Sequence, residues 1–393
     1  MGADPLSDEQ REIRELVRTL ARERIAPRAA EIDATAEFPW DLVELFREHD
    51  VFGLPFEERH GGSGTGVLML LVAIEEISKV CATTGLVLAV QELGSLALKL
   101  AGADELKERY LPRLASGEWL AAYALTEPGS GSDAAAMRTE ARLDGDAYVL
   151  NGSKRFITNA GVAGLYTVFA KTDPADGHAG ISAFLVEAEA PGFSVGRIEP
   201  KMGIKGSTTG EIFFDECQVP AANLLGEEGE GFRIAMRVLD RSRPGIAAQA
   251  LGLAQGATDY ALAYATSRET MGKPIAEHQL VAAKLADMET RCNAARGLLY
   301  KVGLLIDEGV EGPELTKASA EAKLFCADTA MEVTTEAVQV LGGYGYMREY
   351  PVERMMRDAK ITQIYEGTSE IQRLVIAREM VRENRSSLLA EVS

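Results

Sequence analysis

Apolar residues recur at helical spacing through the first part of the chain. In residues 6–27 they follow Ser7 and Asp8, either of which can cap a helix, and they precede Pro27. These apolar positions are Ile13, Leu16, Val17 and Leu20. The spacing returns in residues 38–53, and further helices are expected near 67–81, 84–101 and 103–118. We therefore expect an N-terminal helical domain over residues 1–120.

The pattern changes to short β-branched and aromatic runs over residues 121–232. Asp-Gly, Asn-Gly and Pro-Gly pairs separate these runs, as turns separate strands. Residues 143–157 have the pattern of a hairpin. Because no helix intervenes between the runs, an antiparallel barrel or sandwich is favoured over a parallel sheet.

Helical spacing resumes over residues 233–393 and continues to the end. The expected helices are long, at about 232–269, 276–309, 313–343 and 370–384. Many alanines on them allow close helix packing, as in a bundle. The fold class is therefore α+β multidomain, with a helical, a β and a second helical domain in that order.

Composition and charge exclude several functions. The formal net charge is −19, which opposes nonspecific binding to nucleic acid. The acidic N-terminal segment does not resemble a signal or transit peptide, and the apolar run at 67–80 is interrupted by Glu75 and Glu76. We therefore expect a cytoplasmic protein without membrane insertion. The cysteines and histidines are scattered in no metal-binding spacing, so we expect no metal site and reduced thiols.

Two loops carry groups that suit a ligand. Residues 123–133, YALTEPGSGSD, combine the hydroxyls of Thr126, Ser130 and Ser132 with glycines that permit close backbone approach. Residues 268–279 place Arg268, and with it Thr270 and Gln279, between two helices, where an arginine suits a pyrophosphate. The alternatives are a plain domain connection and a solvated interhelical turn.

Two other segments are ambiguous on their own. Phe156 and Thr158, in KRFITNAG, offer an aromatic face and a hydroxyl, although a strand aromatic usually belongs to the core. Residues 339–354 gather glycines and tyrosines in a bend before Pro351, which suits close backbone approach or an ordinary helix C-cap.

Glu366 lies in IYEGTSE beside apolar residues. Thr368 or Ser369 can cap the helix that follows, but a cap does not need this glutamate. If an apolar ligand excluded water, the pKa of the carboxyl would rise and make it a base suited to a difficult proton. The alternative is an exposed glutamate.

In their order and spacing these segments resemble the acyl-CoA dehydrogenase flavoprotein family over nearly the whole chain. The motifs are YALTEPGSGSD, KRFITNAG, LDRSR, RETMGKPIAEHQ, QVLGGYGYMREYPVERMMRDAKI and IYEGTSE, with KMGIKGSTTGEIFFDECQVP in the middle region. The resemblance implies a helical domain, a β domain and a C-terminal four-helix bundle. It also implies FAD and an acyl-CoA substrate.

The resemblance assigns site residues by motif. For the flavin and its pyrophosphate they are Leu125, Thr126, Ser132, Phe156 and Thr158, with Thr368 and Glu370 at the other end of FAD. For the FAD of a neighbouring subunit they are Arg268, Thr270, Gln279, Gln339, Gly342 and Gly343. For the substrate they are Ser132, Asp240, Arg243, Tyr365 and Gly367, and the catalytic base is Glu366.

The chemistry implied is α,β-dehydrogenation of a short- to medium-chain acyl-CoA, branched chains included. In the family the base removes the α-proton, flavin N5 takes the β-hydride, and electrons pass to an electron-transfer flavoprotein. The family also implies a homotetramer, a dimer of dimers. Val90, Gln91, Glu92 and Gly94 lie on the helix that lines the acyl pocket in relatives.

One branch of the family carries its base at the position of Ser242 instead, and serine cannot act as that base. The chain therefore matches the branch with short-chain, medium-chain and short/branched-chain enzymes. Phe156 and Met271 depart from a frequent Trp and Phe, which leaves flavin affinity and electron-partner docking open.

Three other functions fit the same scaffold. An acyl-CoA oxidase would pass electrons to oxygen, although such oxidases usually have an additional C-terminal domain. A desulfinase-like lyase is opposed by the presence of Glu366. A non-enzymatic acyl-CoA-binding scaffold is opposed by the complete set of FAD motifs.

Overall fold

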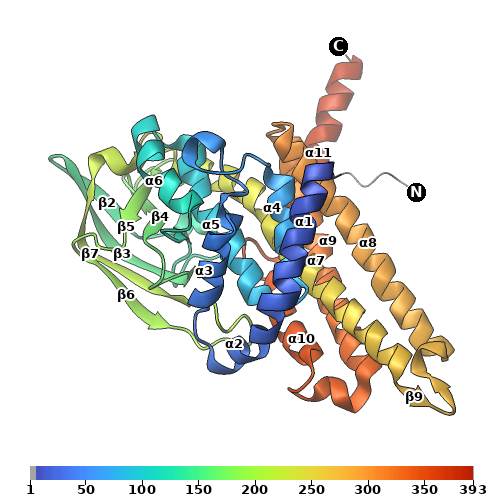
Figure 1. The fold of residues 1–393 in the computed structure, drawn as a ribbon. Helices are drawn as coiled ribbons and strands as arrows, with labels where there is room; N and C mark the ends of the chain where they lie inside the picture. The colour runs from blue at the N-terminus through green and yellow to red at the C-terminus, as the bar shows by residue number, and fades with distance from the viewer. Residues whose placement is uncertain (1–5, 393) are drawn as a thin grey trace.

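The computed structural model describes residues 6–392, and the chain begins with a helical domain (Figure 1). Ser7, rather than Asp8, caps the first helix, since Ser7 Oγ accepts the Gln10 N–H at 3.1 Å and Gln10 Oε1 accepts the Ser7 N–H at 3.0 Å. The helices are α1 (Asp8–Leu20), α2 (Ala29–Thr35), α3 (Trp40–Glu48), α4 (Val67–Ser78), α5 (Ala82–Ala101) and α6 (Asp104–Ala115).

The middle of the chain forms a single eight-stranded sheet. Its strands are β1 (Ala121–Ala124), β2 (Glu140–Asp144), β3 (Ala147–Thr158), β4 (Leu165–Lys171), β5 (Ile181–Glu187), β6 (Phe193–Ile198), β7 (Thr209–Pro220) and β8 (Leu224–Leu225). They are ordered β6-β7-β3-β2-β4-β5-β8, and β1 pairs with β4. Most neighbours are antiparallel, including the β2–β3 hairpin expected from residues 143–157.

The expectation of a wholly antiparallel domain is wrong at two places. β1 runs parallel to β4, and one residue pair of β2 is parallel to β4. A parallel pair needs a long crossover connection, and a helix usually supplies it. Here the crossover from β1 to β4 runs through the 125–139 loop and the β2–β3 hairpin, so no helical pattern reveals it in the sequence.

The C-terminal domain is the expected four-helix bundle. It consists of α7 (Gly231–Ser267), α8 (Gln279–Asp307), α9 (Pro313–Leu341) and the successive helices α10 (Pro351–Thr362) and α11 (Ser369–Val392). A hairpin of β9 (Glu269–Thr270) and β10 (Lys273–Pro274) joins α7 to α8, and the 3₁₀ turn η8 (Gly342–Tyr346) follows α9. α9 packs against all the other helices of the bundle.

The helices α5 and α7 connect the domains. In Figure 1 the sheet lies at the left and the bundle at the right, with α5 between them. The largest apolar core joins α4, α5, α7, α8 and α9, and a second core joins α6, the sheet and the start of α7. α5 is long and apolar enough to cross a bilayer, but 83% of the tested window is buried, as in a core helix. The boundaries expected at residues 120 and 232 remain a prediction.

Candidate active site

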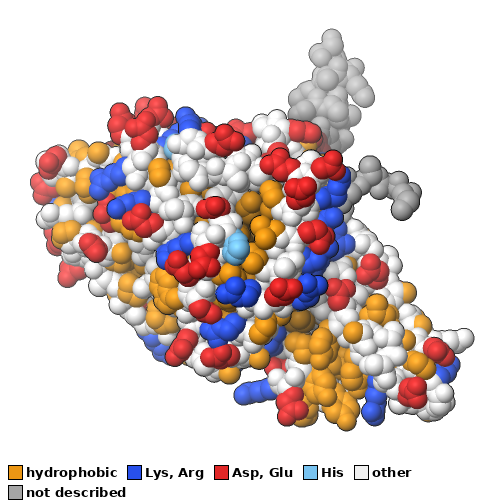
Figure 2. Space-filling view, in the orientation of Figure 1, with side chains coloured by type: hydrophobic (Ala, Val, Ile, Leu, Met, Phe, Trp, Pro, Cys, Tyr) orange, Lys and Arg blue, Asp and Glu red, His pale blue; other side chains and the backbone are white. Residues whose placement is uncertain are grey.

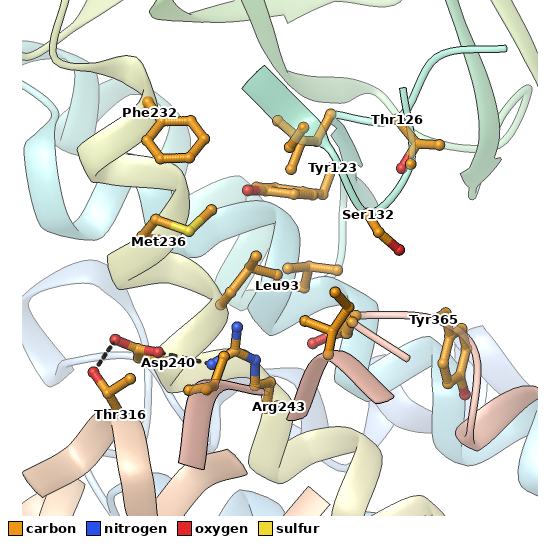
Figure 3. Close-up of a pocket in the computed structure, with 18 of the residues that line it drawn as sticks. Leu93, Tyr123, Thr126, Ser132, Phe232, Met236, Asp240, Arg243, Thr316 and Tyr365 are labelled. Carbon is orange, nitrogen blue, oxygen red and sulfur yellow. Dashed lines mark hydrogen bonds and ion pairs between the residues drawn. The ribbon is translucent and has the colours of Figure 1, made fainter. Parts of the chain in front are cut away.

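A cavity of about 870 Å³ opens where the sheet, α5, α7 and the α10–α11 turn meet. Figure 3 shows Thr126 and Ser132 on the sheet side, with Asp240 and Arg243 of α7 below them. Ten of the residues expected at the flavin and the substrate line this one cavity. They are Leu125, Thr126, Ser132, Phe156, Thr158, Asp240, Arg243, Tyr365, Glu366 and Gly367.

Glu366 is held in the cavity wall by an unusual backbone conformation. Its φ is +53° and that of Gly367 is +91°, in the left-handed region that non-glycine residues rarely adopt. Ser242 Oγ donates a hydrogen bond of 2.7 Å to Glu366 Oε2. Burial raises the pKa of Glu366, and the hydrogen bond from Ser242 and the nearby Lys323 and Arg243 charges oppose that rise. The pKa of this carboxyl group is therefore set by burial on one side and by a hydrogen bond and two positive charges on the other.

The turn that carries Glu366 is fastened by its carbonyl groups. Lys323 Nζ donates to the Gly367 carbonyl at 2.7 Å, and Gln372 Nε2 donates to the Glu366 and Gly367 carbonyls at 3.2 and 2.9 Å. Within the described part of the chain, the N–H groups of Glu366 and Gly367 have no acceptor. The turn thus keeps two backbone donors available beside the carboxylate.

Of the two expected caps of α11, only one acts as a cap. Thr368 Oγ1 accepts the Ile371 N–H at 3.3 Å, whereas the hydroxyl of Ser369 donates to Asp328 at 3.1 Å. Thr368 and Glu370 lie next to the turn but do not line the cavity, and Glu370 is exposed.

Asp240 and Arg243 form a polar pair on α7 in which Arg243 is buried and Asp240 is partly exposed. Arg243 donates to Asp240 at 2.9 Å, and the hydroxyl of Thr316 on α9 donates to the other Asp240 oxygen at 2.6 Å (Figure 3). Burial raises the pKa of Asp240 and lowers that of Arg243. Arg243 Nε has no partner among the described residues, so the guanidinium keeps a donor for a ligand in the cavity.

The sheet side of the cavity is built on a buried ion pair. Lys154 of β3 is fully buried, and its Nζ lies 2.8 Å from Glu127 Oε1. Glu127 also accepts both the N–H and the hydroxyl of Thr139, at 3.0 and 2.6 Å. Burial lowers the pKa of Lys154 to about 8, against the attraction of Glu127. These contacts hold the 125–139 loop, which presents Thr126 and Ser132.

The apolar end of the cavity lies between α5 and α7. It is lined by Leu86, Val90, Leu93, Tyr123, Phe232, Met236 and Leu239. Of the α5 residues expected there, only Val90 takes part. Gln91 instead bonds the Leu114 and Trp119 carbonyls, Glu92 pairs with Lys99, and Gly94 packs on β1. The helical repeat explains the difference, because Leu86, Val90 and Leu93 share one face of α5.

The residues expected to reach a second FAD lie elsewhere. Arg268, Thr270, Gly342 and Gly343 line a separate pocket of about 630 Å³ at the far end of α7, together with Met271. Gln279, which is exposed, and Gln339 do not line that pocket. The structure therefore divides most of the expected cofactor residues between two pockets, and Thr368, Glu370, Gln279 and Gln339 line neither of them.

Comparison with known proteins identifies the family. The N-terminal, middle and C-terminal domain models of acyl-CoA dehydrogenase match residues 7–118, 122–217 and 229–381. Cyclohexane-1-carbonyl-CoA dehydrogenase of Geobacter metallireducens is 49% identical over 96% of this chain and 98% of its own. The chain belongs to the acyl-CoA dehydrogenase family. It is an oxidoreductase with FAD as its cofactor.

Solved structures of similar proteins agree with this membership. Butyryl-CoA dehydrogenase from Megasphaera elsdenii superposes with a TM-score of 0.94 at 44% identity, covering 96% of this chain and 99% of that one. A chain from a study of the electron transferring flavoprotein of Acidaminococcus fermentans gives 0.95 at 45% identity, covering 97% and 100%. The acyl-CoA dehydrogenase fold expected from the motifs is confirmed.

The cavity of this acyl-CoA dehydrogenase fits FAD. Thr126, Ser132 and Thr158 line the cavity with their hydroxyl-bearing side chains, and Phe156, which lines it as well, is 57% exposed. A Cβ built on Gly129 or Gly131 would meet no atom within 4 Å, so the loop leaves room for a ligand against its backbone. When bound, FAD supplies the hydride acceptor.

Several residues of the site were missed by reasoning from the sequence. Gly312, Thr316, Arg378 and Arg382 line the mouth of the cavity, and Gln249 bonds Tyr365 at its inner end. Lys323 was missed as well. Gly312 lies just before α9 and the others lie on the long helices α7, α9 and α11, outside the recognised motifs, where nothing in the local pattern marks them as site residues.

Proposed function

We propose that this acyl-CoA dehydrogenase converts a short-chain acyl-CoA to the trans-2-enoyl-CoA, with Glu366 as the base. The observation that carries the proposal is the position of Glu366. Glu366 lines the same cavity as the apolar residues between α5 and α7 and as the wall of Thr126, Ser132 and Thr158. A carboxylate whose pKa is raised by burial is suited to take a proton from the carbon next to a thioester carbonyl.

The backbone of the same turn completes the site for proton removal. A thioester carbonyl beside Glu366 accepts the unpartnered Glu366 N–H, which stabilises the negative charge that develops on oxygen as the α-proton leaves. The proton moves from Cα to a Glu366 carboxylate oxygen. Ser242 donates a hydrogen bond to Glu366 Oε2 and so keeps the carboxylate oriented.

The polar residues toward the mouth suit the CoA arm. Ser132 projects from the sheet side, and Asp240 and Arg243 face it across the cavity (Figure 3). Arg378 and Arg382 of α11 add positive charge at the mouth, where the phosphates of CoA would lie. Ser132, Asp240 and Arg243 therefore offer polar groups to the pantetheine amides along the cavity that contains Glu366.

A polar pair limits the acyl end of the cavity. The hydroxyl of Tyr365 donates to Gln249 Oε1, and Gln249 Nε2 donates to the Ala82 carbonyl at 2.9 Å. Gln249 is fully buried, so a longer chain that displaced it would leave its amide unpaired. This barrier favours short acyl chains. The similarity to a cyclohexane-1-carbonyl-CoA dehydrogenase makes a compact ring a second chain shape to test.

The second pocket supports a dimer in which one FAD spans two subunits. Arg243 and Tyr264 are 21 positions apart on α7, which corresponds to about 30 Å along a helix. One extended FAD cannot reach both pockets of the same chain. Met271 and Tyr346 near the second pocket are 95% and 79% exposed, and Figure 2 shows hydrophobic side chains gathered at this lower end of the bundle. A second copy would cover them, and a pair of such dimers gives the homotetramer.

The electron acceptor proposed is an electron-transfer flavoprotein, and the compartment proposed is the cytoplasm. The similarity to a chain studied with the electron transferring flavoprotein of Acidaminococcus fermentans supports the acceptor. An oxidase would release peroxide instead, so peroxide is measured in parallel.

The test is an anaerobic titration of the purified yellow protein with butyryl- to palmitoyl-CoA, isobutyryl-, 2-methylbutyryl- and cyclohexane-1-carbonyl-CoA. We expect a short or compact thioester to bleach the flavin of the wild type. Glu366→Gln should retain FAD and stay yellow. Bleaching of Glu366→Gln at the wild-type rate, or no bleaching of the wild type by any thioester, would contradict the proposal.

A further inference from the structure

Lys323 is a buried amine whose role the mechanism above does not use. It lies on α9, its side chain is fully buried, and its Nζ donates a hydrogen bond of 2.7 Å to the Gly367 carbonyl. In the described part of the chain it forms no ion pair with a carboxylate. A buried cation without a paired anion is costly, so such a group is seldom retained for stability alone.

The charges around Lys323 link it to Glu366. Burial lowers the pKa of Lys323 to about 8, and the strongest influence that opposes this shift is the negative charge of Glu366. Arg243 of α7 also lowers it, whereas Asp328 of α9 and Glu370 of α11 raise it. The ammonium group and the carboxylate of Glu366 therefore stabilise each other through space without direct contact.

The hydrogen bond of Lys323 acts on the same turn. Lys323 and Gln372 together donate to the carbonyl groups of Glu366 and Gly367, and neither Lys323 nor Gln372 lines the cavity. This arrangement keeps both residues at positive φ and leaves their N–H groups unpaired beside the carboxylate. A lysine at this place thus affects both the charge and the orientation of the base.

We propose that Lys323 is a positioning residue that fastens the Glu366 turn and supplies the positive charge that keeps the Glu366 carboxylate ionised. The proposal rests on the proposed function, since it takes Glu366 to be the base. Ser242 and Arg243 of α7 also favour the ionised form, and Tyr123 of β1 and Tyr365 of the turn are the other titratable groups near the carboxylate.

The sign of the effect follows from these charges. Removing the positive charge of Lys323 leaves Ser242 and Arg243 to offset the burial of Glu366, so the pKa of Glu366 rises further. The carboxylate is then protonated up to a higher pH. The acid limb of any reaction that needs the ionised base moves upward.

The experiment measures proton removal without hydride transfer. In 3-thiabutyryl-CoA a sulfur replaces the β-carbon, so the thioester has exchangeable α-protons but no β-hydrogen to lose. Exchange of these protons in D₂O, followed by mass spectrometry between pH 5.5 and 9, reports the base alone. The variants of the holoenzyme are Lys323→Met, which lacks charge and donor, and Lys323→Gln, which keeps a donor. Lys317→Met is the control, because Lys317 is a half-buried lysine of the same helix that pairs with Glu383 and does not line the cavity.

We expect both Lys323 variants to retain FAD and to show an acid limb about one pH unit higher, so that exchange on that limb is up to about tenfold slower than in the wild type. Lys317→Met should match the wild type. An acid limb that stays in place in Lys323→Gln would overturn the proposal. Loss of FAD or of the folded state in both variants would also overturn it, because it would show a structural role.

The experiment distinguishes a wrong assignment of Glu366 as the base from a wrong role for Lys323. If the wild type does not exchange the α-protons, or Glu366→Gln exchanges them as fast, the proposed function is wrong. If the wild type exchanges, Glu366→Gln does not, and the Lys323 variants behave as the wild type, only the role of Lys323 is wrong.

Discussion

Among the described residues, Ser242 makes the one hydrogen bond to the Glu366 carboxylate, and the effect of Ser242→Ala on the pH profile can be worked out in advance. Ser242 Oγ donates to Glu366 Oε2 at 2.7 Å, and burial raises the pKa of Glu366 while this bond opposes the rise. Without the donor, the ionised form loses stabilisation that the protonated form does not need. The pKa of Glu366 therefore increases, and the acid limb of kcat/KM moves to higher pH.

The size of the shift follows from the strength of the bond. A hydrogen bond to an ionised group contributes about 1.5–3 kcal/mol, and one pKa unit corresponds to about 1.4 kcal/mol, so the upper limit is about 1–2 units. Water can reach the vacated position through the cavity and restore part of this stabilisation. We therefore expect a shift of about one unit, and a rate on the acid side about tenfold lower than that of the wild type.

The assay is kcat/KM for a short-chain acyl-CoA with an artificial electron acceptor, measured from pH 5 to pH 9. Ser95→Ala is a matched control, because Ser95 on α5 is equally buried and donates to the Glu92 carbonyl at 2.9 Å but does not line the cavity. It should leave the acid limb in place. An unchanged acid limb in Ser242→Ala, with normal FAD content, would refute the reasoning.

Two further predictions concern stability. Burial raises the pKa of Asp358 to about 6 from 3.8, so the folded protein binds this proton more tightly and loses stability as pH rises through that interval. Asp358→Asn keeps an acceptor for the Ile204 N–H and should raise the free energy of unfolding by about 3 kcal/mol at pH 7.5 and about half of that at pH 5; an equal change at both pH values in denaturant titrations would contradict this. A Cβ at residue 367 would lie 2.4 Å from Gln372 Nε2 at a φ of +91°, so Gly367→Ala should cost about 1–3 kcal/mol and lower kcat more than it raises KM. Unchanged unfolding and kinetics in that variant would count against the role given to the turn.

Short-range patterns predicted the elements of the fold well. The caps, the helical spacing and the Gly-containing turns identified helices such as α1 and the β2–β3 hairpin. They failed at the parallel pair of β1 and β4, because that pairing depends on how a long connection crosses the sheet. Local propensity carries no information about such a crossover.

The residues of the candidate site likewise fall into those that local motifs predicted and those that only the tertiary structure reveals. Glu366 and the flavin wall were recognised because they lie in compact motifs, and the cavity brings them together. From the sequence, Ser242 indicated only that this position does not carry the base, as it does in one branch of the family. The structure shows that Ser242 donates a hydrogen bond directly to Glu366. Lys323 is 43 positions from Glu366 in sequence and adjacent to its turn in space, a relation set by the packing of α9 against the α10–α11 turn. Only the tertiary structure reveals such partners.

The most direct test of the account is the exchange of the α-protons of 3-thiabutyryl-CoA in D₂O by the holoenzyme and by Glu366→Gln. This exchange needs a base at the α-carbon and no transfer of hydride, so it isolates the role assigned to Glu366. The account predicts rapid incorporation of deuterium by the wild type and a loss of at least about 100-fold in Glu366→Gln that still binds FAD. Equal exchange by both proteins would show that another group removes the proton and would contradict the central claim.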